Sequence, residues 1–375
     1  MLKRKLMWFA LSKVPELNAH YLERIIDNIG DVEAVFRMKK ADLQKAAMSL
    51  RIPERIIEPI LIVREFDYSI EYEELKKCGV YFVTREEADF PRRLLNIKNA
   101  PFYLYYKGRL PSDEMPALAV IGARNCSVYG KEITVCYSKV LSDCGIQIIS
   151  GMARGIDGYA HKGALESGGY TCAVLGFGVD ICYPKEHTGL KHELEATGGV
   201  ISEYPLGTPG LSRNFPARNR LIAGLSDAVL VVEAAKKSGT LITVDHALEQ
   251  GKMIFAVPGR IGDKLSEGCN EIIKDGGKIV VTPEEIISEF GLQFAVLPKN
   301  SAKQKNKIIL ETQEKIVYAC LDLEPRHIEQ LICLTKLSQD ALLLSLMRLE
   351  MMGYVKQPVK NYYVVNLNEN YRFTK

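Results

Sequence analysis

Apolar residues recur at helical spacing through the first 75 residues and then give way to short β-branched runs. The helical spacing is clear in YLERIIDNIG and again in PERIIEPILIVREF. Gly30 suits the end of one helix, and Asp31 suits the cap of the next helix, VEAVFRM. The pattern therefore predicts a small helical domain over residues 1–75.

Between residues 76 and 290, continuous apolar strands alternate with helical stretches. Such strands indicate a parallel sheet covered on both faces, so the predicted fold is α/β, doubly wound and Rossmann-like. Two further runs, 80–84 and 101–108, are candidates to extend the sheet. The clearest predicted strands are 117–122, 146–150, 171–176, 198–202, 228–233, 252–259 and 278–281.

Residues 291–307 lose periodicity and gain Pro, Asn, Ser and Lys, which is typical of a linker. Three helical stretches and the strand-like run NYYVV follow, and they predict a winged helix over residues 308–375. Ser338 suits the N-cap of the third helix, and Gly353 suits its end.

Composition narrows the class of protein without identifying it. The 375 residues are 47% hydrophobic and 25% charged, which is ordinary for a globular chain of two or three domains. Because the net charge is only +3, any nucleic-acid site must be a local patch. No apolar run approaches transmembrane length, so no membrane association is expected. The nine cysteines form no CxxC pair, which predicts reduced thiols in a cytoplasmic protein and no zinc site.

Three arginines surround one phenylalanine in the segment SEYPLGTPGLSRNFPARNRLIAGLS, residues 202–226. Arg213, Arg218 and Arg220 offer cations to phosphates, while Phe215 offers a flat face to a base, which suits single-stranded nucleic acid. The alternative interpretation is that Phe215 packs in the core and the arginines form surface ion pairs.

Four loops that follow predicted strands carry glycine, small or charged residues. In an open parallel sheet, ligands bind beyond the carboxyl ends of the strands, so these loops are candidate phosphate sites. The first loop read alone is equally compatible with an ordinary turn that carries an exposed arginine. Ser127 is also expected to cap the helix after the first loop, and Ser238 or Thr240 the helix after the last. The candidate residues are Arg124 and Ser127, then Gly151 and Gly155, then Lys185, and finally Ser238, Gly239 and Thr240.

Asp157 and His161 lie four residues apart on the helix that follows the second loop. This spacing occurs in metal sites, but no third ligand is near in the sequence. We therefore expect a helix-stabilising hydrogen bond and no bound metal.

Seven motifs occur in the order IGARNCSVYG, SGMARGIDGYAH, GFGVDICYPKE, SEYPLG, FPARNRLIAGLSDAVLVVEA, SGTLIT and FAVPGR. Together they resemble the DNA-processing protein A family (DprA, also called Smf). The upstream run DFPRRLLNIKNAPFYLYYKG is similar to that family as well, so the resemblance spans roughly residues 80–290. The flanks are similar to a sterile-alpha-motif-like (SAM-like) helical domain and to a winged-helix-like domain.

The resemblance implies sequence-independent binding of single-stranded DNA in a basic pocket at the carboxyl ends of the strands. It also implies a homodimer formed within residues 265–290, and loading of the RecA recombinase during natural transformation with displacement of single-strand-binding protein. It implies no enzymatic activity, no cofactor and no metal. The expected DNA-binding residues are Arg124, Ser127, Gly151, Gly155, Lys185, Arg213, Phe215, Arg218, Asn219, Arg220, Lys236, Lys237, Ser238, Gly239 and Thr240.

Two departures from the family pattern are visible. His187 stands where an asparagine is usual, and Lys360-Asn361 replaces the common glycine-rich wing, which weakens the expectation that the tail binds DNA. The alternative function is a Rossmann-like phosphoribohydrolase of the lysine-decarboxylase-like type, whose GGxGTxxE loop carries a catalytic glutamate. The comparable loop here, 238–243, has no carboxylate. Nicotinamide binding is disfavoured because Arg124 interrupts the glycine fingerprint.

Overall fold

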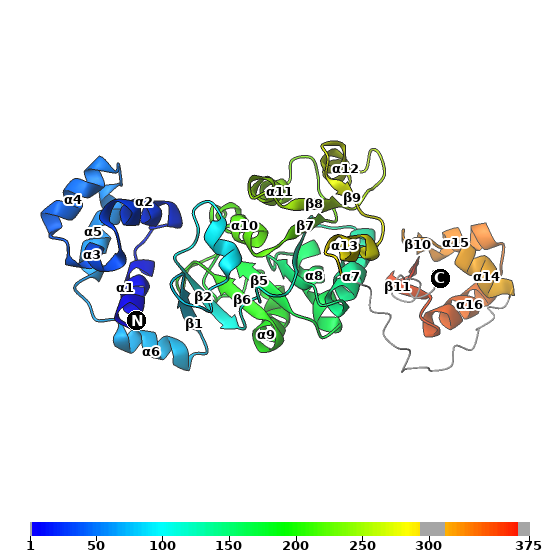
Figure 1. Cartoon of the computed structure of the whole chain (residues 1–375). Helices are drawn as coiled ribbons and strands as arrows, with labels where there is room; N and C mark the ends of the chain where they lie inside the picture. The colour runs from blue at the N-terminus through cyan, green and yellow to red at the C-terminus, as the bar shows by residue number, and fades with distance from the viewer. Residues whose placement is uncertain (1, 293–311, 367–375) are drawn as a thin grey trace.

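The computed structural model describes residues 2–292 and 312–366, which form three parts in chain order (Figure 1). Helices come first, a nine-stranded sheet flanked by helices follows, and a small unit of helices and short strands ends the described chain. The predicted linker lies almost entirely outside the described residues. So do residues 308–311 and 367–375 of the predicted winged helix.

The N-terminal part is helical, as the apolar spacing predicts. Both predicted caps are confirmed: the Asp31 carboxylate accepts from the Ala34 N–H at 2.7 Å, and Gly30 ends α2 with a φ of 110°. A side chain at Gly30 would be strained at that φ. Its helices are α1 (Leu2–Ser12), α2 (Ala19–Ile29), α3 (Val32–Arg37), α4 (Lys40–Ser49), α5 (Glu54–Val63) and α6 (Ser69–Lys77).

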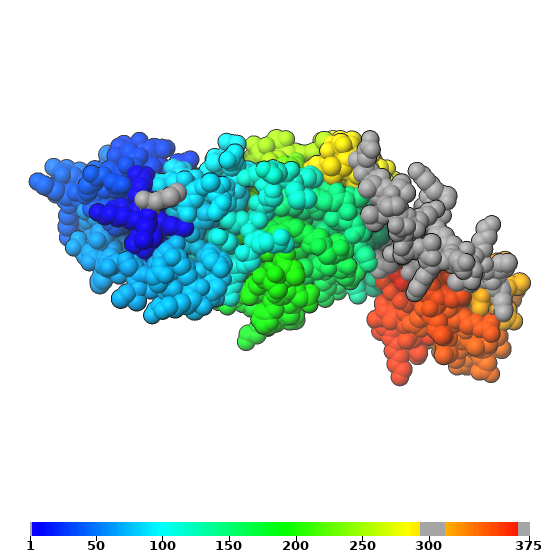
Figure 2. All heavy atoms as spheres, turned by 60° about the horizontal axis from the view of Figure 1, so that its bottom comes forward, coloured from blue at the N-terminus to red at the C-terminus, as the bar shows by residue number. Residues whose placement is uncertain are grey.

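The helical part and the sheet share one aromatic core. Trp8 of α1 lies 5.1 Å from the ring of Phe102, and Phe9 lies 5.4 Å from the ring of Phe82. The hydroxyl of Ser12 bonds that of the buried Tyr105. The space-filling view shows the two parts in continuous contact (Figure 2). The predicted domain boundary at residue 75 therefore falls within a continuously packed region.

The sheet confirms every predicted strand position. Its order is β1-β2-β6-β5-β4-β3-β7-β8-β9, and the strands from β6 to β9 along this order are parallel. The two candidate extensions are present as β1 and β2, which pair antiparallel at one edge. The strands are β1 (Tyr81–Thr84), β2 (Tyr103–Gly108), β3 (Ala117–Ile121), β4 (Gln147–Ser150), β5 (Thr171–Leu175), β6 (Gly199–Ser202), β7 (Ala228–Val231), β8 (Met253–Ala256) and β9 (Lys278–Ile279).

Helices cover both faces of the sheet, which makes the fold doubly wound. On one face, Leu118 and Val120 pack with α7, α8 and α13. On the other face, Ala119 and Ile121 pack with α10, α11 and α12. Successive side chains of β3 thus point to opposite faces of the sheet and pack in different hydrophobic cores, as the two-residue period of a strand requires. The helices are α7 (Val128–Asp143), α8 (Ile156–Glu166), α9 (Thr188–Thr197), α10 (Asn214–Leu225), α11 (Thr240–Glu249), α12 (Glu267–Lys274) and α13 (Pro283–Glu289).

The C-terminal unit is the predicted winged helix. Strands β10 (Arg326–His327), β12 (Tyr362–Val365) and β11 (Val355–Val359) form a small antiparallel sheet beside α14 (Thr312–Ala319), α15 (Ile328–Thr335) and α16 (Gln339–Met351). Ser338 caps α16, as predicted, by accepting from the Ala341 N–H. Asn361 turns the wing with a φ of 66°, a conformation that asparagine tolerates better than most residues.

The described residues were also searched for membrane spans. Across residues 2–292 and 312–366, no helix is both long enough and apolar enough to cross a bilayer.

His161 is a buried titratable group at the junction of α8 and the sheet. Its Nδ1 lies 2.7 Å from the Thr171 hydroxyl, which itself donates to the Ile148 carbonyl. The imidazole must therefore donate through Nδ1, and its Nε2 is buried without a partner. Burial, with smaller contributions from His187 and Arg218, lowers the pKa of His161 to about 3. The expected bond between Asp157 and His161 is absent from the described contacts, because Thr171 takes its place.

This geometry predicts a loss of stability in mild acid. The folded pKa lies below the unfolded value, so the unfolded chain binds the proton first as the pH falls below 6.5. The free energy of unfolding should then fall by about 1.4 kcal/mol per pH unit, or about 2 kcal/mol between pH 6.5 and pH 5. Urea unfolding at several pH values measures this slope. In His161→Gln the slope should be smaller, and equal slopes in both proteins would contradict the prediction.

Candidate functional site

Four loops line the carboxyl edge of the parallel strands. They follow β5, β4, β3 and β7, which are neighbours in that order. With strands about 4.8 Å apart, the four strand ends span about 14 Å. The sequence-predicted residues therefore occupy one continuous edge, as parallel strands require.

The loops after β3 and β4 pack directly against each other. Gly155, with a φ of 74°, leaves no room for a side chain, since a Cβ would lie 2.2 Å from the Ala123 carbonyl oxygen. The Ile156 N–H donates to that same oxygen at 3.2 Å. The glycine thus permits one loop to approach the other, which holds Arg124 at the edge. Direct DNA contact by Gly155 stays a prediction.

Arg218 is buried, unlike the accessible arginine that the sequence suggests. Only 4% of the residue is exposed, and its guanidinium donates to the Gly151 carbonyl at 2.9 Å and to the Val174 carbonyl. A Cβ on Gly151 would clash with that guanidinium and with Asp157. Arg218 therefore connects α10 to the ends of β4 and β5, and contact between its side chain and DNA stays a prediction.

The charge of Arg218 is balanced by Asp157 of α8. Burial lowers the pKa of Arg218 to about 10, and Asp157 acts in the opposite direction. Burial raises the pKa of Asp157, while Arg218 lowers it. Removing either partner would leave the other as an isolated buried charge, which is costly.

Three aromatic rings gather beside this arginine. Phe215 lies 6.5 Å from Phe177 with its ring nearly perpendicular, and 5.9 Å from Tyr183 with the rings tilted by 32°. Phe177 is buried, whereas Tyr183 is 50% exposed. The guanidinium of Arg124 lies 5.5 Å from the Phe215 ring centre, within cation–π range. Phe215 is thus half-buried between core and solvent, which combines the two interpretations that the sequence allowed.

Ser127 caps α7, as predicted, by accepting from the Gly130 N–H at 3.0 Å. Its own N–H and hydroxyl donate to the Glu233 carboxylate at the end of β7. Burial raises the pKa of Glu233. Ser127 therefore holds the loops after β3 and β7 together.

Several exposed cations lie along the edge. Among the described residues, Arg124, Arg213, Lys185 and Lys237 have no ion-pair partner. Their charges are therefore available to an anionic ligand. Other nearby cations are paired: Arg154 with Glu186, Lys236 with Glu271 at 3.3 Å, and Arg220 with Glu203.

Two further groups of predicted residues have local partners. The Asn219 side-chain oxygen accepts from the Nε of Arg218 at 3.2 Å. In the loop after β7, Gly239 is the N-cap residue of α11, and no side chain bonds the first amides of that helix. The expected cap by Ser238 or Thr240 is therefore wrong, and the Ser238 hydroxyl is buried without a partner.

Sequence reasoning did not select Tyr183, Asp157 and Glu233 as site residues. Glu233 had a usable signal, since a carboxylate directly follows an apolar strand. The roles of Tyr183 and Asp157 depend on contacts with α10, and no local pattern shows these. The residues 2–292 and 312–366 contain no cluster of His, Cys, Asp or Glu suited to a metal ion.

Comparison with known proteins finds similarity along most of the chain. Residues 81–291 match the family described as DNA recombination-mediator protein A, and residues 301–358 match the DprA winged helix domain. Protein Smf of Escherichia coli (strain K12) is 37% identical over 303 residues, which cover 79% of this chain and 78% of that protein. Protein Smf of Synechocystis sp. is 30% identical, covering 93% of this chain and 96% of that protein.

Two solved structures are also similar. DNA processing protein A from Streptococcus pneumoniae has a TM-score of 0.65 and 32% identity, covering 76% of this chain and 97% of that one. The protein of the same name from Helicobacter pylori has a TM-score of 0.51 and 29% identity, covering 56% of this chain and 95% of that one. The subject of the latter structure is the single-stranded DNA binding mode of that protein.

The burial of Arg218 predicts that Arg218→Ala destabilises the fold. Loss of the guanidinium leaves Asp157 buried without its counter-charge, so the free energy of unfolding should fall by about 3–5 kcal/mol. Chemical denaturation measures this loss. Arg213→Ala is the matched control, because Arg213 is exposed, and it should change stability by less than about 0.5 kcal/mol. Adding Asp157→Asn to Arg218→Ala should recover part of the loss. Equal stability of the two single variants would refute the buried-charge account.

Proposed function

Because the chain belongs to the DNA recombination-mediator protein A family, also called DprA or Smf, we propose that it binds single-stranded DNA at the carboxyl edge of its sheet. The observation that carries this proposal is a set of exposed cations on the loops of this edge, Arg124, Arg213, Lys185 and Lys237, which have no ion-pair partner among the described residues. Arg124 lies over the ring of Phe215, which packs against the half-exposed Tyr183. Cations beside aromatic faces are what a single strand requires.

In this proposal the aromatic pair contacts bases and the cations contact phosphates. Every base has a flat face, so stacking on Phe215 and Tyr183 does not distinguish one sequence from another. Stacking contributes about 1–3 kcal/mol per base, and charge-assisted contacts add a salt-dependent share. The result is affinity for the strand itself, without readout of base edges.

The buried residues of the site act as positioning residues. Arg218 fixes α10, and hence Phe215, against the ends of β4 and β5. Gly155 lets the two loops meet, and Ser127 ties them to Glu233. We propose that these groups hold the contacting side chains in place before DNA arrives, which lowers the entropic cost of binding.

We propose binding, without catalysis, as the role of this edge. The loop 238–243 carries no carboxylate, and the nearby Glu233 is engaged by Ser127. A general acid or base must lie within hydrogen-bond distance of the ligand atom to which it gives, or from which it takes, a proton. No specific observation favours a phosphoribohydrolase or a nucleotide cofactor.

We extend the proposal to recombination during natural transformation. The family that the chain matches is described as DNA recombination-mediator protein A, which supports a role in recombination. A protein that holds single-stranded DNA could load RecA on it and help to displace single-strand-binding protein. This role requires a cytoplasmic location, and the nine free cysteines fit a reducing compartment.

We also propose a homodimer at the far edge of the sheet. Strand β9 is the last strand of the sheet order, next to β8. Apolar side chains are exposed there, with Ile279 50%, Val281 53% and Met253 43% exposed. Such an apolar edge is typical of a surface that pairs with another chain. It lies partly within the residues 265–290 that the family resemblance implies.

The proposal predicts preferential, salt-sensitive binding to single-stranded DNA. If four cations contact phosphates, the log–log slope of affinity against salt should be about −3. Fluorescence anisotropy of a labelled oligonucleotide, single-stranded against duplex, measures both properties. Phe215→Ala and Arg124→Ala should each weaken binding about tenfold or more.

The matched control is Lys98→Ala. Lys98 is exposed and follows η1 (Arg92–Asn96) in the chain. Arg93 of η1 pairs with Asp227, which lies just before β7 and therefore at the amino ends of the parallel strands, away from their carboxyl ends. This variant should bind DNA as the parent does. A flat salt response, or equal losses in all three variants, would move the DNA site away from the carboxyl edge.

RecA loading has a separate test. On single-stranded DNA coated with single-strand-binding protein, the RecA ATPase should start sooner when the chain is present, because a bound mediator brings RecA to the strand. Arg124→Ala should restore the delay. A chain that binds DNA yet leaves the delay unchanged would disprove the loading role while leaving the DNA site intact.

A further inference from the structure

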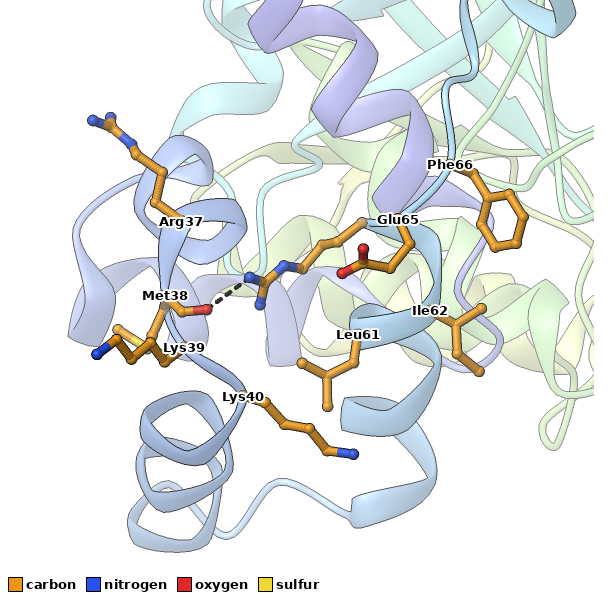
Figure 3. Close-up of a pocket in the computed structure, with 9 residues that line it drawn as sticks. Arg37, Met38, Lys39, Lys40, Leu61, Ile62, Glu65 and Phe66 are labelled. Atoms are coloured by element: carbon orange, nitrogen blue, oxygen red, sulfur yellow. Dashed lines mark hydrogen bonds between the residues drawn. The ribbon is translucent and has the colours of Figure 1, made fainter.

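A pocket of about 660 Å³ lies on the N-terminal helical part, between the junction of α3 with α4 and the C-terminal end of α5 (Figure 3). We call it the N-terminal pocket. Lys39, Lys40 and Arg64 supply its cations, and Leu61, Ile62 and Phe66 supply its apolar surface. It shares no residue with the carboxyl edge of the sheet, and the proposed DNA site leaves it unexplained.

Arg64 adds a partly buried positive charge to the lining of this pocket. One terminal nitrogen donates to the carbonyls of Phe36 and Met38, at 2.6 and 2.7 Å. The Nε and the other terminal nitrogen are buried and have no hydrogen-bond partner. Burial lowers the pKa of Arg64. Within the described chain the guanidinium forms no ion pair, and the nearby Glu65 offsets the effect of burial on its pKa only in part. An anion at the pocket would therefore stabilise this charge further.

The mouth of the pocket adds accessible positive charge. Lys39 and Lys40 are exposed, and neither has an ion-pair partner among the described residues. Arg37 is also at the mouth, but its guanidinium is paired with Glu33 at 2.6 Å. Glu65 is the carboxylate among the lining residues. Cations therefore outnumber carboxylates at this surface.

Large apolar side chains beside these cations are exposed. Phe66 is 63% exposed and Ile62 is 58% exposed, and Figure 3 shows both on the same side of the pocket as Leu61. Large apolar groups next to unpaired cations suit a ligand with both carboxylates and an apolar side chain.

A nucleic-acid strand fits this surface less well. The adjoining hollow includes the carboxylates of Asp31 and Asp42, which would repel any anionic chain that runs on past the pocket, so an anionic ligand here has to be short. Leu61 and Ile62 are aliphatic, so among the lining residues only Phe66 offers a stacking face to a base. The volume is that of a site for a small ligand or a few side chains, rather than an extended strand.

We propose that the N-terminal pocket binds a short acidic peptide segment of a partner protein. Its carboxylates pair with Lys39 and Lys40 beside the partly buried Arg64, and an apolar side chain of the segment contacts Ile62 and Phe66. The site is independent of the proposed DNA site, so either can fail without the other.

Methyl-labelled full-length chain tests the proposal. The probe is a hexapeptide of four glutamates followed by leucine and phenylalanine, with a free carboxyl terminus. Titration should shift the methyl resonances of Ile62 and Leu61, and binding should weaken as salt rises. The same peptide with glutamines in place of glutamates should bind about tenfold more weakly or worse.

Charge reversal provides the matched variants. Lys39→Glu with Lys40→Glu should weaken peptide binding about tenfold, while Lys45→Glu, on the same helix but outside the pocket, should not. Acidic residues are favourable at the start of α4, so the fold should tolerate the double change. Ile62 and Leu61 resonances that stay unshifted at millimolar peptide would overturn the proposal. So would oligonucleotide binding that the double variant abolishes.

Discussion

The buried guanidinium of Arg218 is the interaction on which the carboxyl edge of the sheet depends. It reaches from α10 to the carbonyls of Gly151 and Val174, at the ends of two neighbouring strands, and it faces the carboxylate of Asp157. Backbone carbonyls at strand ends have no further strand partner, so a cation that satisfies two of them fixes both loops. The half-buried Phe215, one turn earlier in α10, takes its position from the same anchor.

Some arginines at this edge form contacts inside the fold, and others are exposed to solvent. Arg218 and Arg220 are engaged inside the fold, by backbone carbonyls and by Glu203, whereas Arg124 and Arg213 remain exposed. The N-terminal pocket shows a similar division, with a partly buried arginine and exposed lysines in one lining.

The sequence allowed the fold to be predicted almost completely, because each strand is a short apolar run bounded by turn residues. Caps such as Asp31 and Ser127 were equally visible, since capping depends on neighbours within three residues. The loops that form the site were predictable, but the burial of Arg218 and the exposure of Arg213 were not. Whether an arginine five residues along a helix is buried depends on strands 40 to 70 residues away, and no local pattern encodes that distance.

The aromatic core that joins α1 to strands β1 and β2 makes the helical part and the sheet a single mechanical unit. Trp8 and Phe9 are almost fully buried against Phe82 and Phe102, so a hinge at this junction would have to expose several rings to water. If both proposed sites are occupied, a peptide on the helical part would therefore lie at a fixed distance from DNA on the sheet. The helical part would then set the spacing between the two ligands.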